Sequence, residues 1–434
     1  MTQKKKNIPE LRFPEFVNEG EWEEKKLIDT TDKKVKWSFT GGPFGSNLKA
    51  SDYTTEGIRI IQLQNIGDGE FNDGYKIYTS ESKADELISC NIYSGEIILS
   101  KMGDPVGRAC VIPDFLKRCV MASDGIRLVV DEKKISKYFI YSLINSKHIR
   151  EAIEKKATGS TRRRIGLEEL KGVKLIVPKK LEQQKIASCL SSLDEVIAAN
   201  SQKLELLKNH KKGLMQNLFP QDGEKVPKYR FKEFENDGEW VEKKLGKVFT
   251  IFQGFAFSSS DSVDEGARWL KIADVSLQHM NHDTPSFLPL EYKEKYINFL
   301  VKKGDYVIAL TRPMLGKELK ISQVDDVYHE SLLNQRVGKL VSKQSLDFVY
   351  YLLQTFRLIS TIEKNIAGNE PPNLSIQQIK DNTIFIPSKP KEQQKIASCL
   401  SALDELITAQ VEKIKQLKQH KKGLMQGLFP KMNE

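Results

Sequence analysis

The sequence lacks the features that mark secreted and membrane proteins. Nowhere do about 18 apolar residues follow one another, the length that a bilayer-spanning helix needs. The basic run near the N-terminus has no apolar stretch behind it, so it does not resemble a signal peptide. We therefore expect a cytoplasmic protein that does not associate with membranes.

Cysteine and histidine are too sparse to indicate a metal centre. The five cysteines form no CxxC pair, and none of the six histidines forms an HExxH or HxH cluster. We expect reduced, structural thiols and no metal site. The cysteines are Cys90, Cys110, Cys119, Cys189 and Cys399.

Motifs for nucleotide and cofactor chemistry are also missing. There is no GxxxxGK(S/T) phosphate loop, and no glycine-rich S-adenosylmethionine loop follows a clear strand. Residues 369–373 are similar to the Asn-Pro-Pro-aromatic signature of adenine methyltransferases, but Glu370 interrupts it and the aromatic residue is absent. These absences favour a chain that is not an enzyme. Its scattered carboxylates leave an autonomous nuclease as an open alternative.

Charge favours a polyanionic partner. Lys and Arg number 68 against 58 Asp and Glu, which gives a net charge of +10 and a pI near 9.0. Basic proteins gain affinity for nucleic acids by releasing the counterions of the phosphates. Because many basic proteins bind no nucleic acid, the net charge alone does not identify the partner, and the local sequence patterns are needed.

The chain repeats itself. Residues 182–220 return as residues 392–430, with 28 identities among 39 positions aligned without gaps. A lead-in segment, residues 11–27, likewise returns as residues 229–245. The sequence is therefore a duplication in which a lead-in, a domain and a conserved segment each occur twice.

The stretches between these repeats are far less alike. We call them head one (residues 28–178) and head two (residues 246–388). They share isolated positions only, such as Gly95 with Gly304 and Gly159 with Gly368. A duplication that keeps its framework while its heads diverge suggests that the heads bind two different things.

Each conserved segment has the pattern of a coiled-coil helix. Apolar residues alternate at steps of four and three, and prolines flank both segments. Asn200 and Lys211 fill gaps in the first copy, as Gln410 and Lys421 do in the second. The predicted seam consists of Ile186, Leu190, Leu193, Ile197, Leu204, Leu207, Leu214 and Leu218, and of Ile396, Leu400, Leu403, Ile407, Ile414, Leu417, Leu424 and Leu428.

Such a helix needs a partner. About 38 residues at roughly 1.5 Å each make a rod on the order of 57 Å, too one-sided to be stable alone. The other copy is the natural partner, in an antiparallel pair related by a pseudo-twofold axis. A coiled coil that joins two chains is the alternative. We expect Lys208, His210, Lys211 and Lys212, with their echoes Lys418, His420, Lys421 and Lys422, to be solvated. A face for another subunit is the alternative.

Both heads are predicted to mix short strands with helices. A glycine-rich loop opens each, at residues 41–46 and 253–258, and an alternating strand pattern follows. Single helices are expected near residues 135–155 and 345–364. The glycines can serve turn geometry alone. They can also bring backbone amides close to phosphate, with Phe44, Phe255 or Phe257 packing on sugar or base, and the sequence leaves both interpretations open.

One stretch is strongly basic. Residues 147–180 hold eleven Lys or Arg against four Asp or Glu, a net of +7. Within it, residues 158–164 mix small hydroxyl side chains with three arginines, which can bind guanine edges or phosphates. A solvated loop is the plain alternative. The counterpart in head two, residues 368–373, is not basic, and its Asn and Glu could read adenine or cytosine edges.

The order and duplication of these motifs resemble the specificity subunits of type I restriction-modification systems. The resemblance rests on residues 11–16 with Trp22, on residues 182–187 after Pro178, on the HKKGLMQ and LFP helix end, and on the second copy of each. It covers nearly the whole chain. It implies an α+β fold, in which two mixed α/β target recognition domains are joined by two long antiparallel coiled-coil helices.

The resemblance also implies a function and partners. Residues 1–178 and 221–388 would form recognition domains that each read half of a split double-stranded DNA target. Residues 179–220 and 389–434 would form helices that set the half-site spacing and dock two methyltransferase subunits, and through them two restriction subunits. The complex would methylate adenine and cleave DNA. S-adenosylmethionine, ATP and magnesium would then belong to the partners, and this chain would bind no cofactor and perform no catalysis.

The alternatives to this function are an autonomous nuclease or methyltransferase-related DNA enzyme, and a coiled-coil ligand-binding scaffold. Loop position and residue chemistry suggest the DNA contacts. The first candidates are Arg162, Arg163 and Arg164. The others are Gln62, Gln64, Lys101 and Arg108 in head one, and Gln253, Lys271, Arg312, Asn369 and Asn373 in head two.

Overall fold

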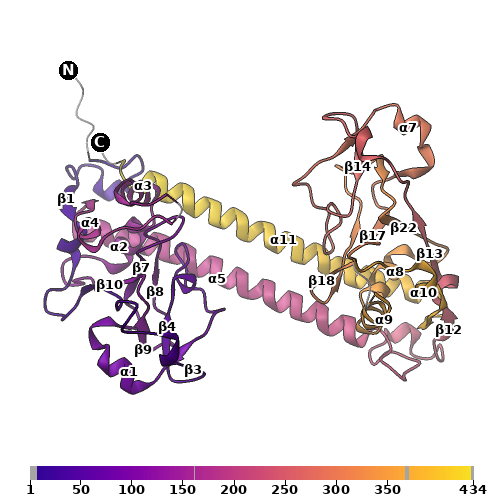
Figure 1. Cartoon of the computed structure of the whole chain (residues 1–434), viewed down its shortest axis with the longest axis horizontal. Coiled ribbons are helices and arrows are strands. Elements are labelled where there is room, and N and C mark those ends of the chain that lie inside the picture. The colour runs from indigo at the N-terminus through magenta and orange to yellow at the C-terminus, as the bar shows by residue number, and fades with distance from the viewer. Residues whose placement is uncertain (1–6, 161, 367–370, 432–434) are drawn as a thin grey trace. The chain divides into compact units, whose positions relative to one another are not determined.

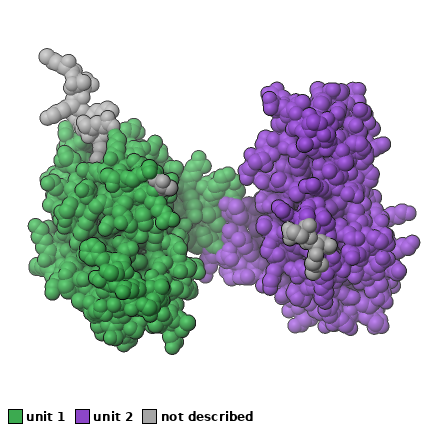
Figure 2. Space-filling view, viewed as in Figure 1, with its two compact units in different colours: residues 1–201, 412–434 green, residues 202–411 purple. Residues whose placement is uncertain are grey.

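The chain divides into two units that are built from the same kinds of elements. The computed structural model describes residues 7–160, 162–366 and 371–431. Unit 1 comprises residues 1–201 and 412–434, and unit 2 comprises residues 202–411 (Figure 2). Each unit therefore holds one head together with parts of both long helices. Two mixed α and β heads and two long helices confirm the expected fold class.

The two conserved segments form the longest helices, α5 (Lys180–Asn217) and α11 (Pro390–Leu428) (Figure 1). A proline occupies the first position of α11, where its missing amide costs no hydrogen bond, and Pro220 and Pro430 follow the helix ends. All side chains of the predicted seam are buried or half-buried, and most of the residues between them are exposed. The apolar periodicity thus does determine which face of each helix is covered.

The helices pair in antiparallel fashion within each unit. In unit 1, Ile186 and Leu190 of α5 share a core with Leu428 of α11, and further along α5 the Asp194 carboxylate binds Lys421. Residues later in α5 therefore contact residues earlier in α11, as expected for antiparallel helices. Unit 2 repeats this arrangement, with Leu218 and Phe219, which directly follow α5, packed near Ile396 and Leu400 of α11. The partner of each helix is the other copy in the same chain.

A partly buried polar triad ties the helices to each head. In unit 2, the Asp404 carboxylate accepts a hydrogen bond from the Tyr351 hydroxyl at 2.7 Å and forms an ion pair with Lys211 Nζ at 2.6 Å. Burial and this carboxylate raise the pKa of Tyr351, which keeps the phenol protonated as a donor. Tyr138 and Lys421 bind Asp194 in the same way in unit 1.

The triads correct one expectation. Lys211 is buried and Lys421 is half-buried, whereas both were predicted to be solvated. Their neighbours Lys208, His210 and Lys212 are exposed as expected. A lysine in a heptad gap is tolerated because an aspartate from the opposite helix pairs with it.

The repeated lead-in segments fix the start of each long helix. Arg12 donates two hydrogen bonds of 2.8 Å to the carboxylate of Glu182, in the first turn of α5. Arg230 binds Glu392 in the first turn of α11 at 2.7 and 2.8 Å. Both glutamates are buried, so these bidentate ion pairs explain why lead-in and helix repeat together.

Head one contains three sheets. A two-stranded antiparallel sheet joins the lead-in to the end of the head. A four-stranded antiparallel sheet has the order β2-β10-β7-β8, and a five-stranded sheet has the order β3-β5-β4-β9-β6 with β4 and β9 parallel. The strands are β1 (Glu23–Lys26), β2 (Phe39–Gly41), β3 (Tyr53–Thr54), β4 (Ile58–Ile61), β5 (Tyr78–Thr79), β6 (Asn91–Tyr93), β7 (Ile97–Ser100), β8 (Ala109–Val111), β9 (Arg118–Met121), β10 (Gly125–Leu128) and β11 (Lys174–Val177).

Head two repeats this topology. The pair β12-β23 matches β1-β11, the sheet β13-β22-β17-β20 matches the four-stranded sheet, and β15-β14-β21-β16 matches the core of the five-stranded sheet, with β14 and β21 parallel. A hairpin, β18-β19, is added. The strands are β12 (Val241–Lys244), β13 (Phe249–Gln253), β14 (Ala267–Leu270), β15 (Phe287–Leu288), β16 (Leu300–Val301), β17 (Tyr306–Ala309), β18 (Met314–Leu315), β19 (Glu318–Leu319), β20 (Ile321–Gln323), β21 (Ser331–Leu333), β22 (Val337–Ser342) and β23 (Thr383–Ile386).

Where one helix was expected in each head, the structure has two. Head one carries α2 (Lys137–Ile144) and α3 (Lys147–Lys156), and head two carries α8 (Leu346–Leu353) and α9 (Phe356–Ile366). In head one the break occurs at Asn145, whose side-chain amide exchanges two hydrogen bonds with the backbone of Ala109 in β8. The remaining short helices are α1 (Glu81–Glu86), α4 (Leu167–Lys171), α6 (Leu245–Val248), α7 (Tyr292–Lys295) and α10 (Ile376–Asp381).

The five cysteines are buried or half-buried. All five cysteines are free, and burial raises the pKa of Cys110 and Cys119 to about 12, so both remain protonated thiols. Within the described ranges, no helix combines the length and apolarity that crossing a bilayer requires.

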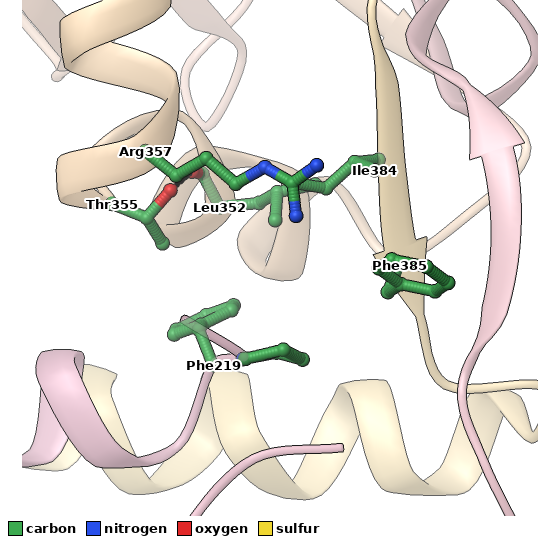
Figure 3. Close-up of a pocket in the computed structure, with 7 residues that line it drawn as sticks. Phe219, Leu352, Thr355, Arg357, Ile384 and Phe385 are labelled. Atoms are coloured by element: carbon green, nitrogen blue, oxygen red, sulfur yellow. Dashed lines mark hydrogen bonds between the residues drawn. The ribbon is translucent and has the colours of Figure 1, made fainter. Parts of the chain in front are cut away.

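The end of α5 closes the core of unit 2. Phe219 packs against Trp240 and Phe348, with ring centroids 6.4 and 5.7 Å away. Beside it, a cavity of about 10 Å³ is lined by residues of α8, the α8–α9 turn, α9 and β23, among them Arg357 of α9 and Phe385 of β23 (Figure 3). This volume holds at most one water molecule, so the contact is a closed core and not a ligand site.

The equivalent end of α11 should be essential for unit 1. Phe429 is 1% exposed and packs on Phe139 at 5.6 Å. Phe429→Ala should lower the free energy of unfolding by about 3–5 kcal/mol, because it leaves a cavity in the core. Phe356→Ala, at a phenylalanine that is 75% exposed, is the matched control. Equal effects of the two substitutions in urea denaturation would contradict this packing.

Candidate nucleic-acid interface

Most candidate contacts of head one gather at one end of its four-stranded sheet. The glycine-rich loop follows β2, residues 101–108 join β7 to β8, and residues 122–124 join β9 to β10. Gln62 follows β4, and the three arginines belong to a loop, residues 158–164, that is closed by hydrogen bonds between the backbones of Thr158 and Arg164. Five segments that are far apart in the sequence thus meet.

Backbone hydrogen bonds hold these segments of head one in place. Together we call them the frame of head one. The bonds run from Ala122 N to Ile61 O (2.9 Å), Gly42 N to Gly125 O (2.8 Å), Lys101 N to Asp124 O (2.6 Å), Gly103 N to Arg163 O (3.2 Å) and Ile165 N to Lys101 O (3.0 Å).

Head two has a frame of the same design. Its glycine-rich loop, the segments after β14 and β17, the turn before β22 and the segment before α10 meet in the same way. The bonds run from Asn334 N to Leu270 O (3.0 Å), Gly254 N to Val337 O (3.1 Å), Leu310 N to Arg336 O (2.8 Å), Arg312 N to Pro372 O (2.8 Å) and Leu374 N to Leu310 O (2.7 Å).

The backbone hydrogen bonds of the two frames join corresponding segments in the same pattern. This pattern defines equivalent positions although the sequences have diverged. The frames keep the backbone and change the side chains. The pairs are Gly42 with Gly254, Gln62 with Lys271, Lys101 with Leu310, Gly103 with Arg312, Ala122 with Asn334, Asp124 with Arg336, Arg163 with Pro372 and Arg164 with Asn373.

The first glycine of each frame is required by close packing. A Cβ on Gly42 would lie 1.9 Å from the carbonyl oxygen of Ala122, and one on Gly254 would lie 2.3 Å from the carbonyl oxygens of Leu333 and Asn334. No other residue type fits there. Neither glycine has a positive φ, so these two positions are explained by the close approach of a neighbouring backbone and not by turn geometry.

The side chains of the head one frame are mostly basic and accessible. Arg162, Arg163 and Arg164 are exposed, and Gln62 and Lys101 are half-buried. The guanidinium of Arg164 donates to the carboxylate of Asp124 at 2.9 Å. This end of the head thus presents guanidinium and amide donors to the solvent.

Two further candidates of head one lie at the margin of the frame. Gln64 is exposed and its amide lies 3.5 Å from that of Gln62, too far for a strong hydrogen bond. Arg108 is half-buried inside the 101–108 loop.

Head two presents cations at other positions of its frame. Lys271 Nζ lies 3.8 Å above the ring of Trp269, and partial burial lowers the pKa of Lys271. Arg312 is exposed and adopts φ of 48°, a left-handed conformation that is strained for a non-glycine residue. Its equivalent is Gly103, with φ of 134°.

The other candidates of head two are also placed. Gln253 donates from its side-chain amide to the Gln335 backbone at 2.7 Å, and exposed Asn373 donates to the Pro371 backbone at 3.1 Å. Asn369 lies outside the described residues.

Only part of the basic stretch 147–180 belongs to this surface. Arg150 is buried and binds Asp68, while Lys171 and Lys174 pair with Glu168 and Glu24. The arginines of residues 162–164 are the part that reaches the frame.

Sequence reasoning missed the turn at the centre of each frame. Residues 122–124 and 334–336 carry Asp124 and the exposed Arg336, and both frames converge on them. A signal was available, because each turn is a short polar segment between two apolar strands. Among the described residues, no group of three His, Cys, Asp or Glu side chains could hold a metal ion.

Comparison with known proteins identifies the architecture. Residues 21–209 and 237–419 each match the family described as "Type I restriction modification DNA specificity domain". The chain belongs to this family. The two matches coincide with the two repeats, so the chain is a specificity protein with two DNA-recognition domains.

Curated relatives are specificity subunits as well. The chain is 28% identical over 317 residues to the type I restriction enzyme MjaVIII specificity subunit of Methanocaldococcus jannaschii, which covers 72% of this chain and 74% of that protein. It is 25% identical over 435 residues to the MjaIX specificity subunit of the same organism, covering 95% and 92%. With the Escherichia coli EcoAI specificity subunit it shares 28% identity over 209 residues, or 48% of this chain and 34% of that one.

Solved structures share the fold. The S subunit of a type I restriction-modification system from M. genitalium matches with a TM-score of 0.57 and 18% identity, over 98% of this chain and all of that one. A chain from a structure of type I complex assembly and conformational transition matches with a TM-score of 0.53 and 15% identity, over 95% and 98%.

The role of the first frame glycine can be tested directly. Gly42→Ala should destabilise this specificity protein by about 1–3 kcal/mol, because the added methyl group collides with a backbone carbonyl. Gly41→Ala is the control, since nothing lies within 4 Å of its added Cβ. Thermal denaturation should show a lower Tm for the first variant only. A Tm unchanged by Gly42→Ala would mean that the loop does not pack on the turn.

Proposed function

We propose that each head reads one half of a bipartite double-stranded DNA target with the side chains of its frame. One observation carries this proposal: the two frames share their backbone hydrogen bonds and differ in the side chains that they present. DNA sequence is read by side-chain donors and acceptors at base edges, on a scaffold that fixes their position. Two frames with different side chains are suited to two different half-sites.

Charge supports DNA as the ligand. Arg162, Arg163 and Arg164 in head one, with Lys271 and Arg312 in head two, place cations on surfaces that phosphates and base edges could contact. Phe44, in the glycine-rich loop, is 82% exposed and could stack on a base or sugar. The remaining candidates, Gln62, Gln64, Lys101, Arg108, Gln253, Asn369 and Asn373, supply amide and cationic groups for base edges.

The long helices are proposed to dock two methyltransferase subunits, and through them two restriction subunits. Exposed apolar side chains on these helices favour a protein partner, since a monomeric helix surface has little use for them. Leu181, Val196 and Leu206 on α5 and Leu406 and Val411 on α11 are of this kind. S-adenosylmethionine, ATP and magnesium would be bound by the partners, and adenine methylation and DNA cleavage would be their reactions.

The test of this function is a map of modified adenines. The chain would be co-expressed with its methyltransferase partner, and the genome sequenced by a single-molecule method. We expect a split motif of two short half-sites that disappears when the chain is deleted. A methylation pattern that does not depend on the chain would contradict the proposal. Catalysis by the isolated chain with magnesium or S-adenosylmethionine would favour an enzyme instead.

The three arginines of head one should contribute to DNA affinity. Replacing Arg162, Arg163 and Arg164 together by Ala should weaken binding of the assembled complex to its target. The slope of log Kobs against log salt should fall by about 0.9 for each phosphate that the variant no longer neutralises. A triple replacement of Lys33, Lys34 and Lys133, which are exposed in head one near the end of β10 opposite to the frame, serves as the charge-matched control. Unchanged affinity and slope in the arginine variant would show that this loop does not contact DNA.

A further inference from the structure

A backbone hydrogen bond fixes Asp124 in head one and Arg336 in head two, the last residues of the two central turns. Lys101 N donates to the carbonyl of Asp124, and Leu310 N donates to the carbonyl of Arg336. The side chains of Asp124 and Arg336 take no part in the frame bonds. Replacing either side chain therefore leaves the frame bonds in place, so the residue type at this position can differ between the heads.

The same position carries opposite charge in the two heads. Asp124 precedes β10 in head one, and Arg336 precedes β22 in head two. Around them the candidate contacts are also exchanged, Arg164 for Asn373 and Gln62 for Lys271. An inverted charge at the point where all frame segments converge changes what each head can hydrogen-bond.

Asp124 acts on a neighbouring arginine. Its carboxylate is 18% exposed and accepts one N–H of Arg164, whose side chain is 52% exposed. An arginine has five N–H donors in a rigid plane, so a carboxylate on one edge orients the remaining donors. Asp124 is thus a positioning residue for Arg164.

Arg336 is placed to make a contact of its own. It is exposed, and among the described residues its guanidinium has no ion pair. The turn beneath it is rigid, because the Asn334 side chain accepts from Arg336 N at 2.9 Å and Gln253 binds the Gln335 carbonyl. An exposed guanidinium on a fixed turn matches the bidentate recognition of guanine O6 and N7.

We propose that positions 124 and 336 are equivalent specificity-determining positions, with Arg336 contacting a base directly and Asp124 acting through Arg164. The inference rests on the proposed function and assigns residues to it. It predicts that each position controls one half-site only.

The test is the recognised sequence itself. Arg336→Lys keeps the positive charge and removes the bidentate guanidinium group. Asp124→Asn keeps the side-chain shape and removes the negative charge. In complexes with the methyltransferase partner, mapped adenine methylation should show one base of one half-site relaxed, by about tenfold or more in preference. The other half-site should be unchanged. A general loss of stability would instead lower methylation at the same motif.

Matched controls lie at the opposite ends of the same strands. Lys343→Ala beyond β22 and Asp131→Asn beyond β10 should leave both half-sites as they are. Because Asp124 acts through Arg164, Asp124→Asn should add nothing once Arg164 is Ala. An additive effect of the two replacements would overturn the positioning role.

The outcomes separate this inference from the proposed function. Intact half-sites in both variants, with methylation still dependent on the chain, would overturn the inference and leave the function standing. Methylation independent of the wild-type chain would remove both. Should a variant lose all methylation, the affinity of the purified complex for oligonucleotides with each base changed would decide, and an equal loss for every base would overturn the inference.

Discussion

The burial of each long helix's Leu-Phe end against the first turns of the other helix is the contact on which both units depend. In unit 1, Leu428 and Phe429 complete the core that holds Ile186 and Leu190. In unit 2, Leu218 and Phe219 do the same near Ile396 and Leu400. Burial of large apolar side chains is the main favourable term in folding, so each head has a closed core only with both helices in place.

Polar contacts then fix the positions of the lead-in, head and helices that apolar contacts bring together within each unit. The Arg12–Glu182 and Arg230–Glu392 pairs anchor the lead-ins, and the triads at Asp194 and Asp404 join head, helix and opposite helix. Buried ion pairs of this kind add little net stability, but breaking one partner is costly, so they favour a single arrangement. The binding surface gains rigid support, and the frames can change side chains without changing the fold.

The repeat architecture could be predicted because its signals are local and periodic. Apolar steps of four and three indicated the seam, and prolines indicated the helix ends. Lys211 was predicted wrongly because its partner Asp404 is on the other helix, nearly two hundred positions away along the chain. The break at Asn145 was missed for the same reason, since a contact with β8 ends the helix and not a helix-breaking residue.

The candidate interface was predictable only in part. Chemistry singled out the arginines at 162–164, and the glycine-rich loops drew attention to residues 41–46 and 253–258. The frames themselves are built from backbone hydrogen bonds between distant segments, which leave no signature in side-chain pattern. The turns with Asp124 and Arg336 therefore look in the sequence like any polar turn between strands.

The two heads share one frame and differ in the side chains that it presents. The decisive experiment replaces head one, residues 28–178, with a second copy of head two, residues 246–388, and maps adenine methylation with the methyltransferase partner. We expect a motif in which the half-site of head one is replaced by a second copy of the half-site that head two reads. A motif that still contains the half-site of head one would contradict the claim.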